Sequence, residues 1–125
     1  MPEPTEPYRI QLDEKFGKST LIDIPAEVAA CSDEWFNQTL TTVNDAVVRL
    51  GIVKGEFHWH KHEEEDEFFL VLKGRLHLDI EDQTSIVLEP HQAYTVPKGV
   101  LHRSRAPERT VILMIEPREV IPTGD

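Results

Sequence analysis

The amino-acid sequence predicts an all-β domain, either a sandwich or a barrel. Six short runs rich in strand-forming residues fall within residues 46–117, and turn residues such as Gly, Pro and Asp separate them. In the run over residues 75–80, apolar residues at 76, 78 and 80 alternate with polar residues at 75, 77 and 79. Such alternation is typical of a sheet with one buried and one solvated face, so we expect His77 to face solvent.

Length, charge and composition limit the classes of function. A chain of 125 residues, 39% of them hydrophobic, makes one domain with a core of its own. Its net charge of -10 opposes binding to nucleic acid. A single cysteine excludes an internal disulfide, and neither a signal peptide nor an apolar stretch of about 20 residues is visible. We therefore expect a cytoplasmic protein that has no nucleic-acid partner and no membrane partner.

The first third of the chain is weakly patterned. Residues 1–7 contain three prolines and are expected to form a disordered tail. Residues 8–46 are expected to supply N-terminal strands and a short helix that complete the barrel or form a dimer contact. Within this region, residues 19–25 have a strand-like composition, and the apolar residues of 27–40 have a weak helical spacing.

Two glycine turns can be placed in the second half. Gly74 separates the runs over residues 68–72 and 75–80. A tight hairpin requires the positive φ that glycine adopts, so these two strands are expected to pair. Pro97 and Gly99 suit a type II turn, which delivers the chain to His102.

The segment from Gly55 to Gly74 carries the most informative chemistry. His58, His60 and His62 occupy every second position, and five carboxylates follow at 63–67. Side chains alternate across a strand, so in an extended segment all three imidazoles leave the same face. A carboxylate and one more imidazole from elsewhere, for which the histidine at 102 is a candidate, would complete a site for a divalent transition metal.

The spacing that follows these histidines resembles a family motif. His60, one residue, His62, four residues, Glu67, six residues and Gly74 are similar to the first motif of the cupins. The glycine that opens this motif, Gly55, stands one residue too close to the histidines.

A second segment resembles the other cupin motif. Pro97, one residue, Gly99, two residues and His102 match its centre. At its ends, His91 stands where the motif has glycine and Ala106 where it has asparagine. These departures concern the geometry of turns and pairing more than the binding of a metal.

The resemblance to the cupins implies a fold, a site and an assembly. The fold is the cupin double-stranded β-helix, a jelly-roll-like barrel over residues 47–125, with a short N-terminal extension. The resemblance also implies one divalent transition metal, either Fe, Mn, Ni, Zn, Co or Cu, inside the barrel. Its implied ligands are His60, His62, Glu67 and His102. Cupins are commonly dimers, so a homodimer is expected.

A different register of the first motif must also be considered. Residues 58–60 form a His-x-His pair too, and they resemble the HWH of some oxalate-decarboxylating cupins. In this register the carboxylate would be Glu64 or Glu65, and neither is followed by a glycine at the distance that the hairpin needs. Turn chemistry therefore favours the register that uses Glu67.

Two kinds of function are compatible with these residues. One is a metal-dependent enzyme, by family analogy an oxygenase, an isomerase or a decarboxylase, that acts on a small polar metabolite. The other is a non-catalytic module that binds or senses a small ligand, because no general base stands at a recognisable offset. His58, Tyr94 and Phe69 are candidates to contact the ligand or to support the metal ligands, and His58 alternatively packs against the barrel wall.

Overall fold

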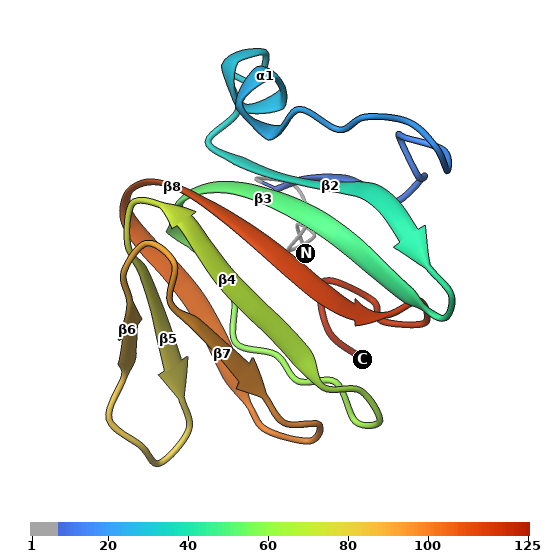
Figure 1. Ribbon diagram of the computed structural model, residues 1–125. Helices are drawn as coiled ribbons and strands as arrows, with labels where there is room; N and C mark the ends of the chain where they lie inside the picture. Colours follow the sequence, from blue (N-terminus) through green and yellow to red (C-terminus); the bar gives the residue numbers. More distant parts are fainter. Residues whose placement is uncertain (1–7) are drawn as a thin grey trace.

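The computed structural model describes residues 8–125, so the tail predicted over residues 1–7 lies outside the described part of the chain. The fold is all-β, as predicted (Figure 1). Its elements in chain order are β1 (Arg9–Gln11), α1 (Ile24–Ala29), β2 (Trp35–Val43), β3 (Ala46–Glu56), β4 (Glu67–Lys73), β5 (Leu76–Ile80), β6 (Ile86–Leu88), β7 (Ala93–Val96) and β8 (His102–Pro117). No helix within residues 8–125 is long and apolar enough to cross a membrane.

The strands form one sheet that bends around an interior. Hydrogen-bonded neighbours follow the order β1-β2-β3-β8-β4-β7, while β5 pairs with β6 and β8. The long strand β8 belongs to both walls, because residues 111–115 pair with β4 and residues 102–105 pair with β5. In Figure 1, β5, β6 and β7 lie on the side opposite to α1.

The turn at Gly74 is present, but the hairpin predicted across it is not. Gly74 has a φ of +90°, and a Cβ atom at this position would lie 2.5 Å from Thr110 Oγ1. The strands on either side, β4 and β5, do not pair with each other, because each pairs with a different half of β8. The turn therefore carries the chain from one wall of the barrel to the other.

The N-terminal region differs from the local predictions. Asp23 caps α1 by accepting a hydrogen bond from Ala26 N at 3.3 Å, and the helix then spans only Ile24–Ala29. Residues 35–40, which were expected to be helical, begin β2 and pair with β3. Residues 19–22 form no strand. Strand pairing and burial outweigh the weak helical spacing of this region.

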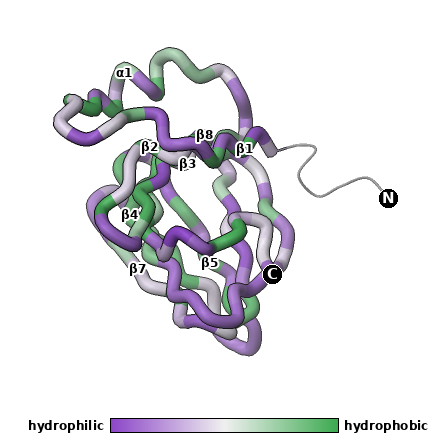
Figure 2. Tube along the Cα trace, turned by 90° about the vertical axis from the view of Figure 1, so that its right-hand side faces the viewer, coloured by the Kyte–Doolittle hydropathy of each residue, from purple (hydrophilic) through white to green (hydrophobic). Residues whose placement is uncertain are grey.

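Apolar clusters lie on both faces of the long sheet. The interior cluster includes side chains from β2, β3, β4 and β8, among them Trp35, Val53, Phe69, Ile112 and Met114. The outer cluster contains Leu40, Leu50, Ile52 and Val111, and the N-terminal segment covers it with Phe16, Ile22, Ile24 and Val28. Figure 2 shows this segment and α1 lying across β2 and β3. The N-terminal segment thus covers the outside of the sheet and leaves the interior available for a site.

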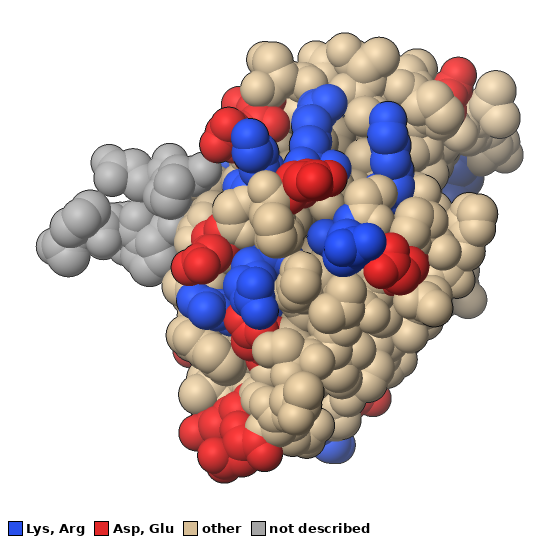
Figure 3. All heavy atoms as spheres, turned by 90° about the vertical axis from the view of Figure 1, so that its left-hand side faces the viewer, with Lys and Arg blue, Asp and Glu red and all other residues tan. Residues whose placement is uncertain are grey.

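The polar face of β5 is covered rather than solvated. Asp79 is only 5% exposed, and it accepts hydrogen bonds from Arg103 Nε at 2.8 Å, from Arg105 Nε at 2.7 Å and from the Ser85 hydroxyl. His77 is half-buried. The prediction of a solvated face is therefore wrong at Asp79, because arginines of β8 lie over it. Figure 3 shows acidic and basic side chains interleaved on this side of the molecule.

Candidate metal centre

Three chain segments meet inside the barrel. His60 and His62 lie between β3 and β4, Glu67 begins β4 and His102 begins β8. The histidine segment is not a continuous strand, and its one bridge in the described chain joins His60 to His102, whose N–H groups each donate to the other's carbonyl oxygen at 2.9 Å. The expected alternation persists nevertheless, since the residues at 59 and 61 are exposed while His60 and His62 are buried.

The turn that precedes His102 ties the two motifs together. Val100 N donates to Pro97 O at 3.3 Å, and Gly99 supplies the positive φ of a type II turn, +78°. Gly99 N also donates to His62 O at 2.7 Å. His91, which replaces a glycine of the family motif, has a φ of +72° and so keeps the backbone conformation that glycine adopts freely.

The four side chains that the resemblance implied as ligands lie together. One donor atom from each of His60, His62, Glu67 and His102 lies within 4.8 Å of all the others, and all four residues are buried. Glu67 Oε1 lies 3.2 Å from His102 Nε2 and 3.4 Å from His62 Nε2. The cluster does not include His58.

Backbone carbonyls orient two of the imidazoles. His60 Nδ1 lies 3.0 Å from His58 O, and His102 Nδ1 lies 2.9 Å from Val100 O. A carbonyl oxygen can only accept, so each Nδ1 carries the proton and each Nε2 keeps a free lone pair. Metal-binding histidines in proteins are held in this way by a partner on their other nitrogen.

The charge states also suit a metal. Burial, together with the neighbouring His102, lowers the pKa of His60 to about 4, so this imidazole is neutral at pH 7. Burial raises the pKa of Glu67, but the imidazoles of His102 and His62 beside the carboxylate outweigh burial and hold that pKa well below its usual range. Neutral imidazoles and ionised carboxylates are the forms in which these groups bind divalent transition metals.

His62 shows most directly that the cluster fits a metal ion. Its side chain is fully buried, and neither ring nitrogen has a hydrogen-bond partner among residues 8–125. Burial lowers the pKa of His62, but the Glu67 carboxylate outweighs burial and raises it. A buried polar nitrogen without a partner is costly. A bound cation would accept the lone pair of a His62 ring nitrogen. It would also replace the proton that the Glu67 carboxylate draws to His62.

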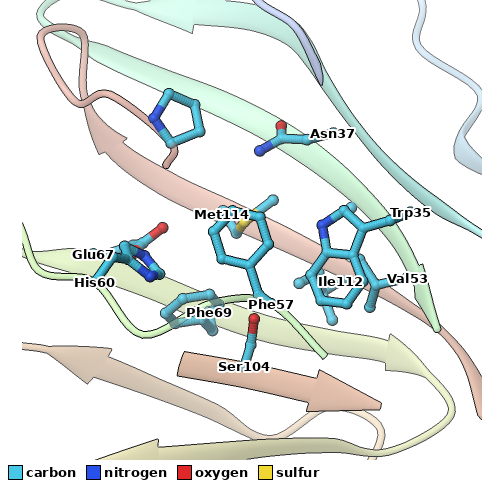
Figure 4. A pocket seen from close by; sticks show the side chains of 12 residues that line it. Trp35, Asn37, Val53, Phe57, His60, Glu67, Phe69, Ser104, Ile112 and Met114 are labelled. Atoms are coloured by element: carbon cyan, nitrogen blue, oxygen red, sulfur yellow. The ribbon is translucent and has the colours of Figure 1, made fainter. Parts of the chain in front are cut away.

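The cluster opens onto a small apolar cavity of about 30 Å³. His60 and Glu67 lie at one end of it, and Trp35 and Val53 lie at the other (Figure 4). Its lining is completed by Asn37, Gly51, Phe57, Phe69, Ser104, Ile112, Met114 and Pro122. A volume of this size holds roughly two water-sized groups.

The three further candidates for ligand contact lie in different places. Phe69 is buried and lines the cavity. His58 is half-buried, its Nε2 lies 2.7 Å from Thr123 O, and it reaches the cluster through its backbone carbonyl. Tyr94 is half-buried on β7, opposite Phe69 in the strand register. Neither His58 nor Tyr94 is among the described residues that line the cavity.

Sequence reasoning missed the polar residues of the interior. Arg49 Nη1 donates to Glu116 Oε2 at 2.5 Å in a buried pair, and Asn37 lies in the cavity wall. Burial and the nearby Glu67 carboxylate raise the pKa of Glu116. The strand pattern held a signal for Arg49, because residues 49, 51 and 53 share one face of β3. The signal for Asn37 was hidden by the helical interpretation of residues 27–40.

Fold and cluster together define a β-barrel with a candidate site for one metal ion, held by three imidazoles and a carboxylate. Residues 47–116 match the family model of the cupin domain. The chain therefore belongs to the cupin family, and the predicted double-stranded β-helix is confirmed.

Individual relatives agree with this assignment. The uncharacterised protein YdbB of Bacillus subtilis strain 168 is 41% identical over 83 residues, which are 66% of this chain and 74% of YdbB. A cupin-2 domain protein of Shewanella frigidimarina has a crystal structure with a TM-score of 0.73 and 35% identity, over 78% of this chain and 94% of that one. Protein NMB1881 of Neisseria meningitidis shares the fold, with a TM-score of 0.70 and 23% identity over 78% of this chain and 99% of that one.

Proposed function

We propose that this cupin binds one divalent transition metal through His60, His62, Glu67 and His102, and that the metal holds a small polar metabolite on which the protein acts. The observation that carries the proposal is the position of the donor set. Its four residues are buried together, and two of them, His60 and Glu67, also form the end wall of the cavity.

The composition of the donor set supports binding of an oxygen-bearing molecule. Four protein ligands leave about two positions of an octahedral ion for water or a metabolite. A divalent ion beside one carboxylate would carry a local charge near +1, and such an ion attracts anionic oxygens and acidifies bound water. Metal-dependent oxygenases, isomerases and decarboxylases use an ion of this kind on small oxygen-bearing substrates.

A specific observation also favours a second candidate, a non-catalytic binding or sensing module. Among the described residues that line the cavity, the only ionisable side chains are His60 and Glu67. Both are candidate metal ligands, so the wall holds no further side chain that could act as a general base. Chemistry that needs such a base is therefore not supplied by this cavity.

Metal analysis of tag-free protein tests the proposal. We expect about one transition metal per chain in the wild type and in His77→Ala, a control histidine on β5 outside the cluster. His102→Ala should lower the metal content more than tenfold, because it removes a direct ligand. Equal metal content in both variants would refute the assignment. Oxygen consumption by the Fe(II)-loaded protein with a panel of small carboxylates then separates an oxygenase from a binding module.

A further inference from the structure

The chain that follows β8 folds back onto the histidine segment, residues 58–63. It reverses direction in a turn in which Val120 N donates to Pro117 O at 3.1 Å. Figure 1 shows this reversal after the end of β8. Val120 is buried, so the base of the returning chain is fixed. The residues beyond this turn, 121–125, are called the strap below.

Three hydrogen bonds join the strap to the histidine segment. His58 Nε2 lies 2.7 Å from Thr123 O, and His58 is the donor because a carbonyl oxygen can only accept. Asp125 N donates to Lys61 O at 3.1 Å, and Glu63 N donates to Asp125 Oδ2 at 2.6 Å. Within residues 8–125, the strap makes no hydrogen bond to a strand. It is therefore held from one side only.

The strap lies directly against a candidate metal ligand. Gly124 has a φ of +100°, and a Cβ atom at this position would lie 2.6 Å from His60 Cβ. A residue with a side chain could not take this place without moving the strap or the ligand. Pro122 is buried and lines the cavity. The strap therefore forms part of the wall at the end of the cavity that carries the metal cluster.

The closed cavity is too small for a metabolite. Its volume is about 30 Å³, whereas small-molecule sites usually measure about 300–1,000 Å³. Most described residues of its wall lie on the paired strands β2, β3, β4 and β8. Phe57 and His60 are also tied to β8, through Ser104 O and the bridge to His102. Pro122 is the remaining wall residue, so the strap is the part that moves at the lowest cost.

Opening the strap needs little free energy. The groups of the three broken hydrogen bonds would bond to water instead, so the net loss per bond is small. Five residues would regain backbone freedom, and this gain in entropy favours the open state. Segments with few buried contacts open locally while the rest of the fold stays intact. The sheet would not need to change.

We propose that the strap gates the candidate metal centre, and that His58 is the positioning residue that latches it. The inference rests on the proposed metal function. The closed strap leaves room beside the metal for water-sized groups only, and the open strap admits an oxygen-bearing metabolite. His58 then acts through the strap and does not bind the metal, which agrees with its absence from the ligand cluster.

Stopped-flow mixing of Co(II)-loaded protein with acetohydroxamate tests the gate, with binding followed by the visible spectrum of the metal. This probe binds metals through two oxygens and is larger than the two water-sized groups that the closed cavity holds. In the wild type, the observed rate should level off at high probe concentration, because opening of the strap then limits binding.

Substitutions of His58 test the latch. His58→Phe keeps the ring that stacks on Phe57 and loses the donor to Thr123, so the limiting rate should rise about fivefold. His58→Gln keeps an N–H donor and should return the rate towards that of the wild type. Both variants should keep their metal. Loss of metal in His58→Phe would overturn the latch, because His58 would then support the metal itself.

A matched pair of glycine variants separates closure of the strap from backbone strain. Gly124 and Gly55 have φ values of +100° and +105°, but a Cβ atom at Gly55 would have nothing within 4 Å. Gly124→Ala should raise the limiting rate more than about tenfold, and Gly55→Ala should leave it within about twofold of the wild type. Asp125→Ala, at an exposed position, removes only the bond to Glu63 N and should act like His58→Phe.

The outcomes separate the two proposals. Wild-type protein without metal refutes the proposed function. Normal metal content refutes only the gate if the wild-type rate rises linearly with probe concentration, or if Gly124→Ala and Gly55→Ala have the same limiting rate. A faster Gly124→Ala together with an unchanged His58→Phe refutes only the role of His58.

Discussion

Replacing Asp79 by asparagine tests whether a buried carboxylate braces the wall that carries a candidate metal ligand. Asp79 is opposite Arg103 in the β5–β8 register, and the next pair is Ile80 with His102. Three donors reach the carboxylate, two of them guanidinium groups. Asparagine keeps one acceptor oxygen but has no charge. Arg103 and Arg105 therefore lose their ion pairs with residue 79.

The expected loss follows from the contacts. A hydrogen bond to a charged group contributes about 1.5–3 kcal/mol. The side chains of Arg103 and Arg105 are 26% and 30% exposed, so water replaces part of the lost interaction. We expect Asp79→Asn to lower the free energy of unfolding by about 2–3 kcal/mol and the Tm by roughly 6–15 °C.

The pH dependence has a definite sign. Burial raises the pKa of Asp79, but hydrogen bonds from its three partners outweigh it and hold the pKa well below the usual 3.8. The unfolded chain therefore takes up a proton near pH 3.8 while the folded chain does not. The stability difference between wild type and Asp79→Asn should be constant at pH 5–7 and should shrink as the pH falls below about 4.

Chemical denaturation at several pH values, with Tm from calorimetry, measures both effects. Glu81→Gln, at an exposed position two residues further on, is the control and should change the free energy of unfolding by less than about 0.5 kcal/mol. The reasoning is wrong if Asp79→Asn matches this control, or if the difference stays constant down to pH 3.

Two further perturbations test the turn and the cluster. At Gly74 an alanine would have to adopt a positive φ, and its Cβ atom would clash with Thr110. Gly74→Ala should therefore lower the free energy of unfolding by at least about 2 kcal/mol in a denaturation experiment. Gly99 has a φ of +78°, but a Cβ atom added at this position would have nothing within 4 Å, so Gly99→Ala should cost only about 1 kcal/mol. Equal losses of stability in the two alanine variants would contradict the packing argument. In metal-free protein, the neutral form of His60 contributes stability that is lost as the pH falls from 6.5 towards about 4. The stability of wild type relative to His60→Gln should fall across this range by at most about 1.4 kcal/mol per pH unit, and a flat difference in metal-free titrations would be the contrary result.

Local patterns predicted strands and turns well in the second half of the chain, but not the pairing of the strands. Gly74 marks a turn because its φ is positive, which is a local property. That β4 and β5 both pair with β8 depends on contacts with residues 102–115, which no local pattern contains. Asp79 shows the same limit. Alternation predicts which face of a strand a residue occupies, but not that Arg103 and Arg105 will cover that face.

The candidate metal ligands were predictable because the spacing of His60, His62, Glu67 and His102 resembles the two cupin motifs. The turn at Gly74 then favoured the register that uses Glu67. Asn37 was not predictable in this way. It lies in a weakly patterned segment, and only the register of β2 against β3 reveals that it faces the cavity.

Anomalous X-ray diffraction from crystals of tag-free, metal-loaded protein tests the central claim most directly. We predict one metal peak per chain, in coordination contact with His60, His62, Glu67 and His102, with its remaining positions directed into the cavity beside Phe69. A peak that is coordinated by His58 in place of His62, or no peak at this cluster in metal-loaded crystals, would contradict the account.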